Sequence, residues 1–395
     1  ATELERILRQ ESPLARKPTP LVRIWRRTLR RPTRALLATG SVGVCVLAAW
    51  AYSAGARERT LSAWVTLAEG LDPAAFELRA FRLDPLTNAA VEEIELQLQP
   101  NDPQRLEPGI FRFVFRHRNA PGHDFAELTR SLEAKQECVL EPHIVDSGTA
   151  QAGMLRIPAG TYRVGVSEPY PDYALEVTIS GFLIDRTETS NADYAEFLAA
   201  EPSAPRPQNW PEGSLTEAWL RRPVILLPFD AVQRYCEWRG KRLPTWIEWE
   251  IAATGPVAHR FPWGDEPTGR AVVAQPAPQA PREAPDHVRF GYFEGTVPVA
   301  ESAGDDVSPF GLLHTYGNVR EWTETHLVRP GGPDFAGRQT RGFAWHDSPA
   351  VLHPLDHLQD APSDRVVMYG FRCARSIDAE KSLQLSFRPR TEEKR

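Results

Sequence analysis

Side chains that can bind a metal or transfer a proton are concentrated near the C-terminal end of the chain. They are His346, Asp347, His353, Asp356 and His357. Two histidines and one carboxylate are the usual protein ligands of a non-haem iron(II) centre. Pro354, however, disfavours a regular helix that would carry His353 and His357 together. The cluster therefore predicts either an iron site or histidines that lie at the surface or in hydrogen bonds.

Five motifs rich in glycine and aromatic residues follow one another in the second half of the chain. They are 240–250 (GKRLPTWIEWE), 261–265 (FPWGD), 316–322 (YGNVREW), 341–345 (RGFAW) and 369–375 (YGFRCAR). As an ordered set they resemble the formylglycine-generating enzyme family, that is, the sulfatase-modifying-factor domain. The resemblance covers about 153–375. It implies an irregular α+β fold related to C-type lectins. Trp249, Trp263 and Trp322 within these motifs are expected to be core rings rather than a binding platform.

The same resemblance makes the absence of two cysteines informative. In the active oxidases of this family, an Arg-Gly-Gly-Ser segment leads into two cysteines that hold copper. Here the stretch 341–352 contains no cysteine, Ala344 replaces the serine, and Asp347 and Leu352 stand near the two cysteine positions. Leucine cannot bind a metal, and a lone carboxylate is a hard ligand that does not select copper(I). We expect a chain that keeps the scaffold of the family without its oxidase chemistry.

The resemblance also implies a possible structural calcium site in 314–321. The backbone carbonyls of Gly317 and Val319 and the carboxylate of Glu321 match ligand positions of the family, and His314 replaces an asparagine. Calcium prefers oxygen ligands, so the imidazole weakens the match. We expect no cofactor, with calcium at this segment as the alternative.

Two of the four cysteines match a pair that is disulfide-bonded in a secreted relative, and the resemblance therefore implies a bridge between Cys236 and Cys373. A bridge that closes so long a loop contributes on the order of 4–5 kcal/mol by the entropic estimate. It would fit an oxidising compartment. Two buried free thiols are the alternative. Cys138 has no obvious partner, and Cys45 lies in an apolar run.

A ligand pocket is expected where the family carries out its reaction. Arg341, Trp345, His346 and Asp347 would surround it. An aromatic wall with a few charged groups suits a peptide or a small polar ligand. Family members without catalytic residues serve as binding or structural modules, and some are attached to serine/threonine kinases through a single membrane span.

The N-terminal quarter of the chain has a strong charge asymmetry. Residues 1–34 contain ten Lys and Arg against three Glu, a net charge of +7, whereas the whole chain carries −6. No residue in 35–56 is charged, and Trp50 and Tyr52 lie near the end of this apolar run. About 20 apolar residues span the hydrocarbon core of a bilayer as a helix. The basic segment then predicts a cytoplasmic N-terminus, with residues 60–395 periplasmic or extracellular.

Three other interpretations of this region compete with a membrane anchor. A basic arm can bind nucleic acid, but next to an apolar run it is more typical of a topology signal, and we expect no nucleic-acid partner. A cleaved signal peptide usually has a shorter apolar run and a shorter basic region. A buried core helix would show a polar face, which 35–56 lacks. A single-span anchor is the prediction.

Between the span and the lectin-like domain, 60–148 is predicted to form a small β-rich, sandwich-like unit. The segments 76–83 and 91–98 largely alternate apolar with polar residues, and 110–117 places Phe111, Phe113 and Phe115 on one face. We interpret this unit as a stalk without a ligand of its own. The lectin-like domain is assigned to 153–376, and 377–395 is assigned to a charged, mobile tail.

These observations predict a single-pass membrane protein that presents a non-catalytic binding or sensory module outside the cytoplasm. Its expected partners are a peptide or small polar ligand, the membrane, and a cytoplasmic kinase, either a separate chain or one fused upstream of a chain that begins with Ala1. An oxidase with a divergent metal site and a structural scaffold of an envelope complex are the two alternatives.

Overall fold

The structure is a computed structural model that describes 62–85, 87–119, 124–165, 175–265, 295–301, 306–329, 332–345, 347, 359–360, 368–378 and 386–388. From Ser62 onward the chain forms one compact unit. The predicted basic segment and membrane span, 1–34 and 35–56, lie outside the described residues. Among the residues that are described, none of the helices combines the length and the apolar character needed to cross a membrane.

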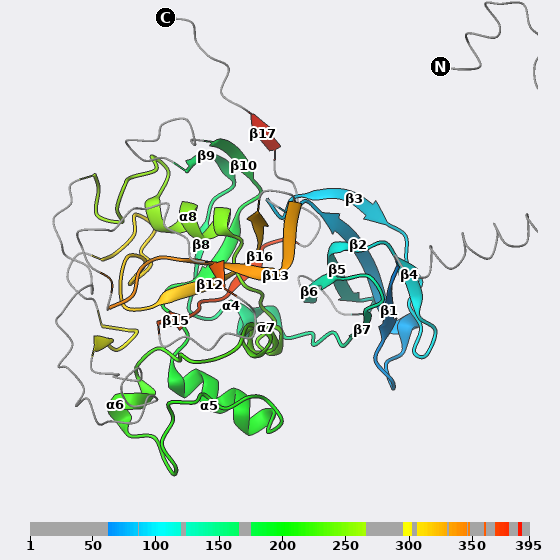
Figure 1. The fold of residues 1–395 in the computed structure, drawn as a ribbon, viewed down its shortest axis with the longest axis horizontal. Coiled ribbons are helices and arrows are strands. Elements are labelled where there is room, and N and C mark those ends of the chain that lie inside the picture. The colour runs from blue at the N-terminus through cyan, green and yellow to red at the C-terminus, as the bar shows by residue number, and fades with distance from the viewer. Residues whose placement is uncertain are drawn as a thin grey trace, which may run out of the picture. The chain divides into compact units, whose positions relative to one another are not determined.

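The first part of the unit, which we call the β-rich part, consists of two sheets (Figure 1). One has the strand order β3-β2-β5-β6, and the other has the order β4-β1-β7. The strands are β1 (Ala63–Leu67), β2 (Phe76–Leu83), β3 (Ala90–Ile94), β4 (Gln104–Leu106), β5 (Gly109–His117), β6 (Phe125–Leu132) and β7 (Glu137–Leu140), and a short 3₁₀ helix, η1 (Pro73–Ala75), precedes β2.

The core of the β-rich part lies between these sheets. Phe111, Phe113 and Phe115 alternate along β5 and pack in one buried cluster with Ala63 and Val65 of β1. Each fully buried side chain of this kind stabilises the fold by roughly 1.5–3 kcal/mol. The shared face predicted for the three phenylalanines is therefore confirmed.

One strand is shorter than its alternating pattern predicts. The pattern in 91–98 continues to Leu98, but β3 ends at Ile94, and its pairing with β2 covers Ala80–Leu83. Beyond Ile94 the chain turns toward the other sheet. There Pro100 pairs with Leu67, and the Thr66 hydroxyl donates to the Gln99 carbonyl at 2.9 Å. Packing between the sheets thus overrides the local alternation.

The second part, which we call the α+β part, is built from small sheets and short helices. Its sheets have the orders β17-β10-β9, β16-β11-β8 and β14-β13-β12-β15. Its strands are β8 (Met154–Ile157), β9 (Gly160–Val164), β10 (Leu175–Ile179), β11 (Phe182–Asp185), β12 (Arg320–Arg329), β13 (Gly332–Arg341), β14 (Gln359–Asp360), β15 (Tyr369–Gly370), β16 (Ala374–Ser376) and β17 (Ser386–Arg388). Pairing of β17 with β10 corrects the prediction that all of 377–395 is a mobile tail.

The helices of this part are α4 (Ser147–Gln151), α5 (Asn191–Ala200), α6 (Glu217–Leu220), α7 (Phe229–Trp238) and α8 (Trp246–Thr254). Side-chain caps begin the helices α5 and α8. Ser190 begins α5 in a capping box with Asp193, and Thr245 begins α8 in a capping box with Glu248. Each box satisfies backbone N–H groups that the first helical turn leaves unbonded.

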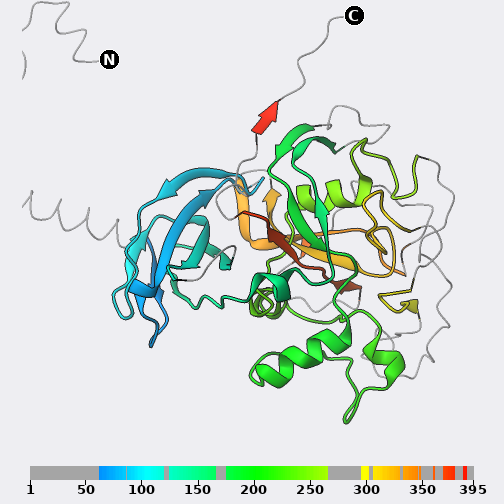
Figure 2. The same ribbon diagram turned by 180° about the vertical axis from the view of Figure 1, so that it is seen from behind.

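A buried cluster of charges joins the two parts. Arg112 of β5 donates to Glu324 of β12 at 2.7 Å, and Glu127 of β6 lies 3.3 Å from Arg242. Glu127 also accepts from the Ser376 hydroxyl at 2.7 Å. In Figures 1 and 2, β6 lies next to α7, at the same boundary. Buried ion pairs and hydrogen bonds therefore fix the β-rich part to the α+β part.

Candidate functional site

The segment after β13 occupies the place where the sequence predicts a pocket. Gly342 has a φ of +76°, and a Cβ there would lie 3.2 Å from both the Thr315 carbonyl oxygen and the Trp249 ring. Glycine is therefore required for the chain to leave β13 in this direction. The turn that follows brings Asp347 back to Ala344, whose carbonyl accepts from the Asp347 amide at 2.9 Å.

Asp347 is held by contacts within the protein. Its Oδ2 atom accepts from the Ala344 amide at 2.7 Å and lies 3.0 Å from Nη2 of Arg320. The guanidinium of Arg320 lies over the Phe343 ring, 5.2 Å from its centroid. The carboxylate near the family's cysteine position thus closes a turn and neutralises a cation.

Arg341 points into the interior. It is 5% exposed, lies 4.8 Å above the Trp246 ring, and has Glu250 as its ion partner at 3.7 Å. Burial lowers the pKa of Arg341 and raises the pKa of Glu250. Nε and Nη1 of Arg341 have no hydrogen-bond partner among the described residues. Arg341 is therefore a buried cation with one long ion pair, not a side chain that lines an open surface.

Trp345 is also buried. Its amide donates to the Asn318 carbonyl at 2.9 Å, and its ring packs so closely on Gly295 that a Cβ there would lie 2.0 Å from the ring. Three of the four predicted pocket residues, namely Arg341, Trp345 and Asp347, thus contribute to internal packing. His346 lies outside the described residues, so the pocket as a whole stays a prediction.

The iron hypothesis is not tested by the geometry. Besides His346, the residues His353, Asp356 and His357 lie outside the described residues, as does Leu352. No group of three or more His, Cys, Asp or Glu residues in the described part of the chain is arranged to hold a metal ion.

The residues proposed for calcium do not fit that ion. Oε1 of Glu321 accepts from Arg372 at 2.7 Å, and Oε2 accepts from Arg372 and from the Trp249 indole, each at 2.7 Å. His314 contacts Oε2 of Glu188 at 3.1 Å and the Glu301 carbonyl at 2.7 Å. Both oxygens of the Glu321 carboxylate therefore already accept hydrogen bonds from a guanidinium and an indole.

Sequence reasoning missed the buried polar cluster around His314. Glu188 is 1% exposed and also accepts from the Asn318 amide group at 2.8 Å, and Asp306 is fully buried and accepts from the Tyr316 backbone N–H at 3.1 Å. Arg372 was visible in the motif 369–375 as a cation among apolar residues, which is the one signal that pointed to a buried partner. Nothing in the sequence pairs it with Glu321.

Asp306 makes the stability of this cluster depend on pH. Burial raises its pKa to about 7, although His314 and the Tyr316 amide oppose that shift. An acid whose pKa is higher in the folded state destabilises the fold as it ionises, so stability should fall as the pH rises from about 4 to about 7. We expect Asp306→Asn to gain stability relative to the wild type over this window, by up to about 4 kcal/mol. Urea unfolding at a series of pH values measures the difference, and a difference independent of pH would contradict the assignment.

Cys236 of α7 and Cys373, just before β16, lie side by side. Their sulfur atoms are 3.1 Å apart, and both side chains are buried. Burial raises the pKa of Cys236 well above its usual value. The structure has the two residues as free thiols in contact. The predicted disulfide therefore stays a prediction, for which the two side chains are well placed.

A serine and a histidine meet at the boundary between the two parts, but they cannot act as a nucleophile and its base. Nε2 of His326 lies 2.9 Å from the Ser131 hydroxyl, while Nδ1 contacts Nη1 of Arg338. Arginine can only donate, so Nδ1 is the acceptor and Nε2 of a neutral ring carries the proton. The histidine then donates to Ser131 and cannot accept the serine proton.

Comparison with known proteins gives a consistent result. Residues 143–377 match the sulfatase-modifying factor enzyme 1-like domain family. A formylglycine-generating enzyme of Thermomonospora curvata is 30% identical over 286 residues, which cover 56% of this chain and 93% of the relative. The inactive C-alpha-formylglycine-generating enzyme 2 of Mus musculus is 28% identical, covering 58% of this chain and 87% of the relative.

The chain is also similar to an oxygenase and to a solved structure. Hercynine oxygenase of Mycolicibacterium smegmatis is 30% identical over 330 residues, which cover 68% of this chain and 72% of the relative. Among solved structures, PvdO from Pseudomonas aeruginosa is 22% identical and covers 57% of this chain and 94% of its own, with a TM-score of 0.43.

Proposed function

This chain belongs to the sulfatase-modifying factor enzyme 1-like family, and from that membership we propose that it is a non-catalytic member that serves as a binding or sensory module. In this proposal, residues 35–56 anchor the chain in a membrane, and residues 60–395 lie in the periplasm or outside the cell. A cytoplasmic kinase, fused upstream or bound as a separate chain, would receive the signal. The anchor and the kinase rest on the sequence pattern alone.

The contacts of Asp347 are the observation that supports a non-catalytic role. A copper(I) site needs soft ligands whose electron pairs are free to bind the ion. Near one of the two family cysteine positions, this chain has a carboxylate that already accepts hydrogen bonds from Arg320 and from the Ala344 amide. Oδ2 of this residue thus has a structural use in place of the soft thiolate that copper(I) would need.

A metal-dependent oxygenase is the second candidate, and the similarity to hercynine oxygenase favours it. In that case, two of the histidines would supply imidazole ligands together with one carboxylate, drawn from His346, Asp347, His353, Asp356 and His357. The third candidate, a scaffold component of an envelope complex, shares the inactive domain with the leading proposal and differs from it only in having no soluble ligand.

Metal content and oxygen consumption separate the first two candidates. We expect the full chain, purified in mild detergent and incubated with copper(I) or iron(II), to retain far less than one metal ion per chain and to consume no oxygen with a cysteine-containing peptide. The formylglycine-generating enzyme of Thermomonospora curvata, treated in the same way, is the positive control. Near-stoichiometric metal that is lost in His353→Ala and His357→Ala, together with oxygen uptake, would overturn the proposal.

Protease protection in intact cells tests the proposed topology. Cleavage of residues 60–395 by a protease on the cytoplasmic side would exclude a periplasmic or extracellular location of these residues.

A further inference from the structure

An open groove runs along one edge of the β-rich part. Strand β3 pairs with β2 only over Ala80–Leu83 in the described part of the chain, so the β3 side of residues Phe76–Arg79 carries no neighbouring strand. The other side of the same residues pairs with β5. Because backbone groups of alternate strand residues point to opposite sides, two of these four residues direct N–H and C=O groups toward the open side.

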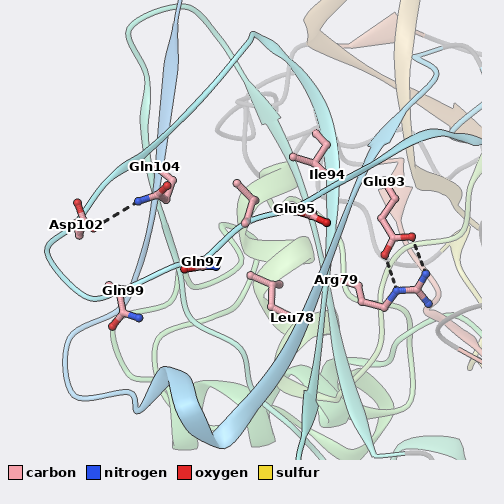
Figure 3. A pocket seen from close by; sticks show the side chains of 10 residues that line it. Leu78, Arg79, Glu93, Ile94, Glu95, Gln97, Gln99, Asp102 and Gln104 are labelled. Atoms are coloured by element: carbon pink, nitrogen blue, oxygen red, sulfur yellow. Dashed lines mark hydrogen bonds and ion pairs between the residues drawn. The ribbon is translucent and has the colours of Figure 1, made fainter.

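The groove forms because the chain diverges after Ile94. A hollow of about 900 Å³ lies between β2 and the segment 93–99, with Leu78, Arg79, Glu95 and Asp102 in its lining (Figure 3). A second hollow of about 400 Å³ shares Leu78 with the first and extends the groove past Phe76. We call the two together the β2 edge groove.

The lining combines an apolar floor with negative charge. Leu78 and Leu96 line both hollows and pack on the core between the two sheets. Arg79 is bound by both oxygens of Glu93, at 2.7 and 2.9 Å, as Figure 3 shows. Its positive charge is therefore already neutralised within the protein.

The remaining carboxylates of the first hollow have no such partner. Asp102 accepts only a long hydrogen bond from the neutral amide of Gln104, at 3.5 Å, and Glu95 has no cation beside it among the described residues. The walls also carry the amides of Gln97 and Gln99, which can donate to or accept from a backbone. The first hollow is therefore lined by three carboxylates and one arginine, an excess of negative charge.

We propose that the β2 edge groove binds an extended, basic segment of a partner protein as an added strand beside residues Phe76–Arg79. Main-chain hydrogen bonds to the open edge of β2 would hold the segment, and alternate side chains would give specificity. Lysine or arginine side chains on one face would approach Glu95 and Asp102, and apolar side chains on the other face would pack on Leu78 and Leu96. This ligand class would serve the proposed binding function, but the groove lies away from the lectin-like site and does not depend on whether that site is catalytic.

The test uses the full chain in mild detergent and a fluorescent eight-residue peptide of alternating lysine and valine. We expect saturable binding in fluorescence anisotropy, weakened at least about tenfold by N-methylation of alternate peptide amides, which removes hydrogen bonds and keeps the charge. Replacement of lysine by glutamate in the peptide should abolish binding. Glu95→Gln/Asp102→Asn should weaken it by about tenfold, whereas Glu107→Gln, which removes an exposed carboxylate outside the groove, should leave it unchanged.

Each contrary result overturns the proposal. Absence of binding at about 1 mM peptide excludes a basic strand as the occupant. Equal binding of the N-methylated peptide would show that the backbone edge is not used, and an equal effect of Glu107→Gln would show that only the overall charge matters. Failure of this test leaves the metal and oxygen measurements untouched, so the two proposals can fail independently.

Discussion

Arg372→Leu should unfold the protein or reduce its free energy of unfolding by about 5 kcal/mol or more. Arg372 is fully buried, and its guanidinium binds both oxygens of Glu321 at 2.7 Å. It also donates to three backbone carbonyls, those of Asp185, Arg186 and Leu313, at 2.8–3.2 Å. The substitution leaves a buried carboxylate without its cation and removes one donor from each of three carbonyls, of which that of Arg186 still accepts from the Leu313 amide at 2.9 Å. Because domains are stable by only about 5–15 kcal/mol, a loss of this size is decisive.

Two further variants show whether loss of the ion pair with Glu321, or only loss of side-chain volume, causes the destabilisation of Arg372→Leu. Glu321→Leu/Arg372→Leu removes both charges, and we expect it to be less destabilised than Arg372→Leu, because the penalty of an isolated buried charge is gone. Arg234→Met is the matched control, since Arg234 is well exposed and lies 3.5 Å from Glu201. Urea unfolding provides the comparison. A double variant as unstable as the single one, or a control equally damaged, would contradict this account.

Features that depend on residues close together in the sequence could be predicted from the sequence alone. Strand β2 lies at the predicted positions because alternation in 76–83 reflects one buried face. The caps of α5 and α8 were predictable because Ser190 and Thr245 each precede an acidic residue by three positions. The sulfatase-modifying-factor domain is recognisable from its ordered motifs, in agreement with the family match over 143–377.

Features that depend on distant partners were not predictable. Arg112 meets Glu324 across 212 residues of sequence, and Arg372 meets Glu321 across 51. No local pattern indicates which buried charge pairs with which, so the sequence does not show that Glu321, named as a ligand in the calcium alternative, pairs with Arg372. The early end of β3 has the same origin, since the chain after Ile94 follows the packing of the second sheet rather than its own alternation.

Glu127→Gln should cost about 3–5 kcal/mol and should separate the unfolding of the two parts of the unit. Glu127 is 6% exposed and accepts from the Ser376 amide and hydroxyl at 3.1 and 2.7 Å. It lies between two cations, 3.8 Å from Arg112 and 3.3 Å from Arg242. Neutralising it removes a buried carboxylate from both guanidiniums, so that Arg112 keeps only Glu324 and Arg242 keeps only Glu248 as ion partners among the described residues. The β-rich part is then less strongly coupled to the α+β part.

The charge of Glu127 also determines the pH below which the contact between the two parts loses stability. Burial alone would raise the pKa of Glu127, but Arg242 and Arg112 outweigh burial and lower it. An acid with a lowered pKa stabilises the fold above its unfolded value near 4.5, and that stabilisation is lost as the pH falls through the folded value. The wild type should therefore unfold in one transition at pH 7 and lose this coupling only in acid.

The Glu127→Gln variant should already show two transitions in urea at pH 7, followed by tryptophan fluorescence and by circular dichroism. Glu107→Gln is the matched control, because Glu107 is 79% exposed in its side chain and pairs only with the surface residue Arg82. Surface pairs of this kind contribute about 1 kcal/mol at most. A single transition of unchanged midpoint in Glu127→Gln would mean that apolar packing alone joins the two parts. Two transitions would show that buried charge makes the β-rich part and the α+β part unfold as one body, so that a ligand bound at the β2 edge groove stabilises both.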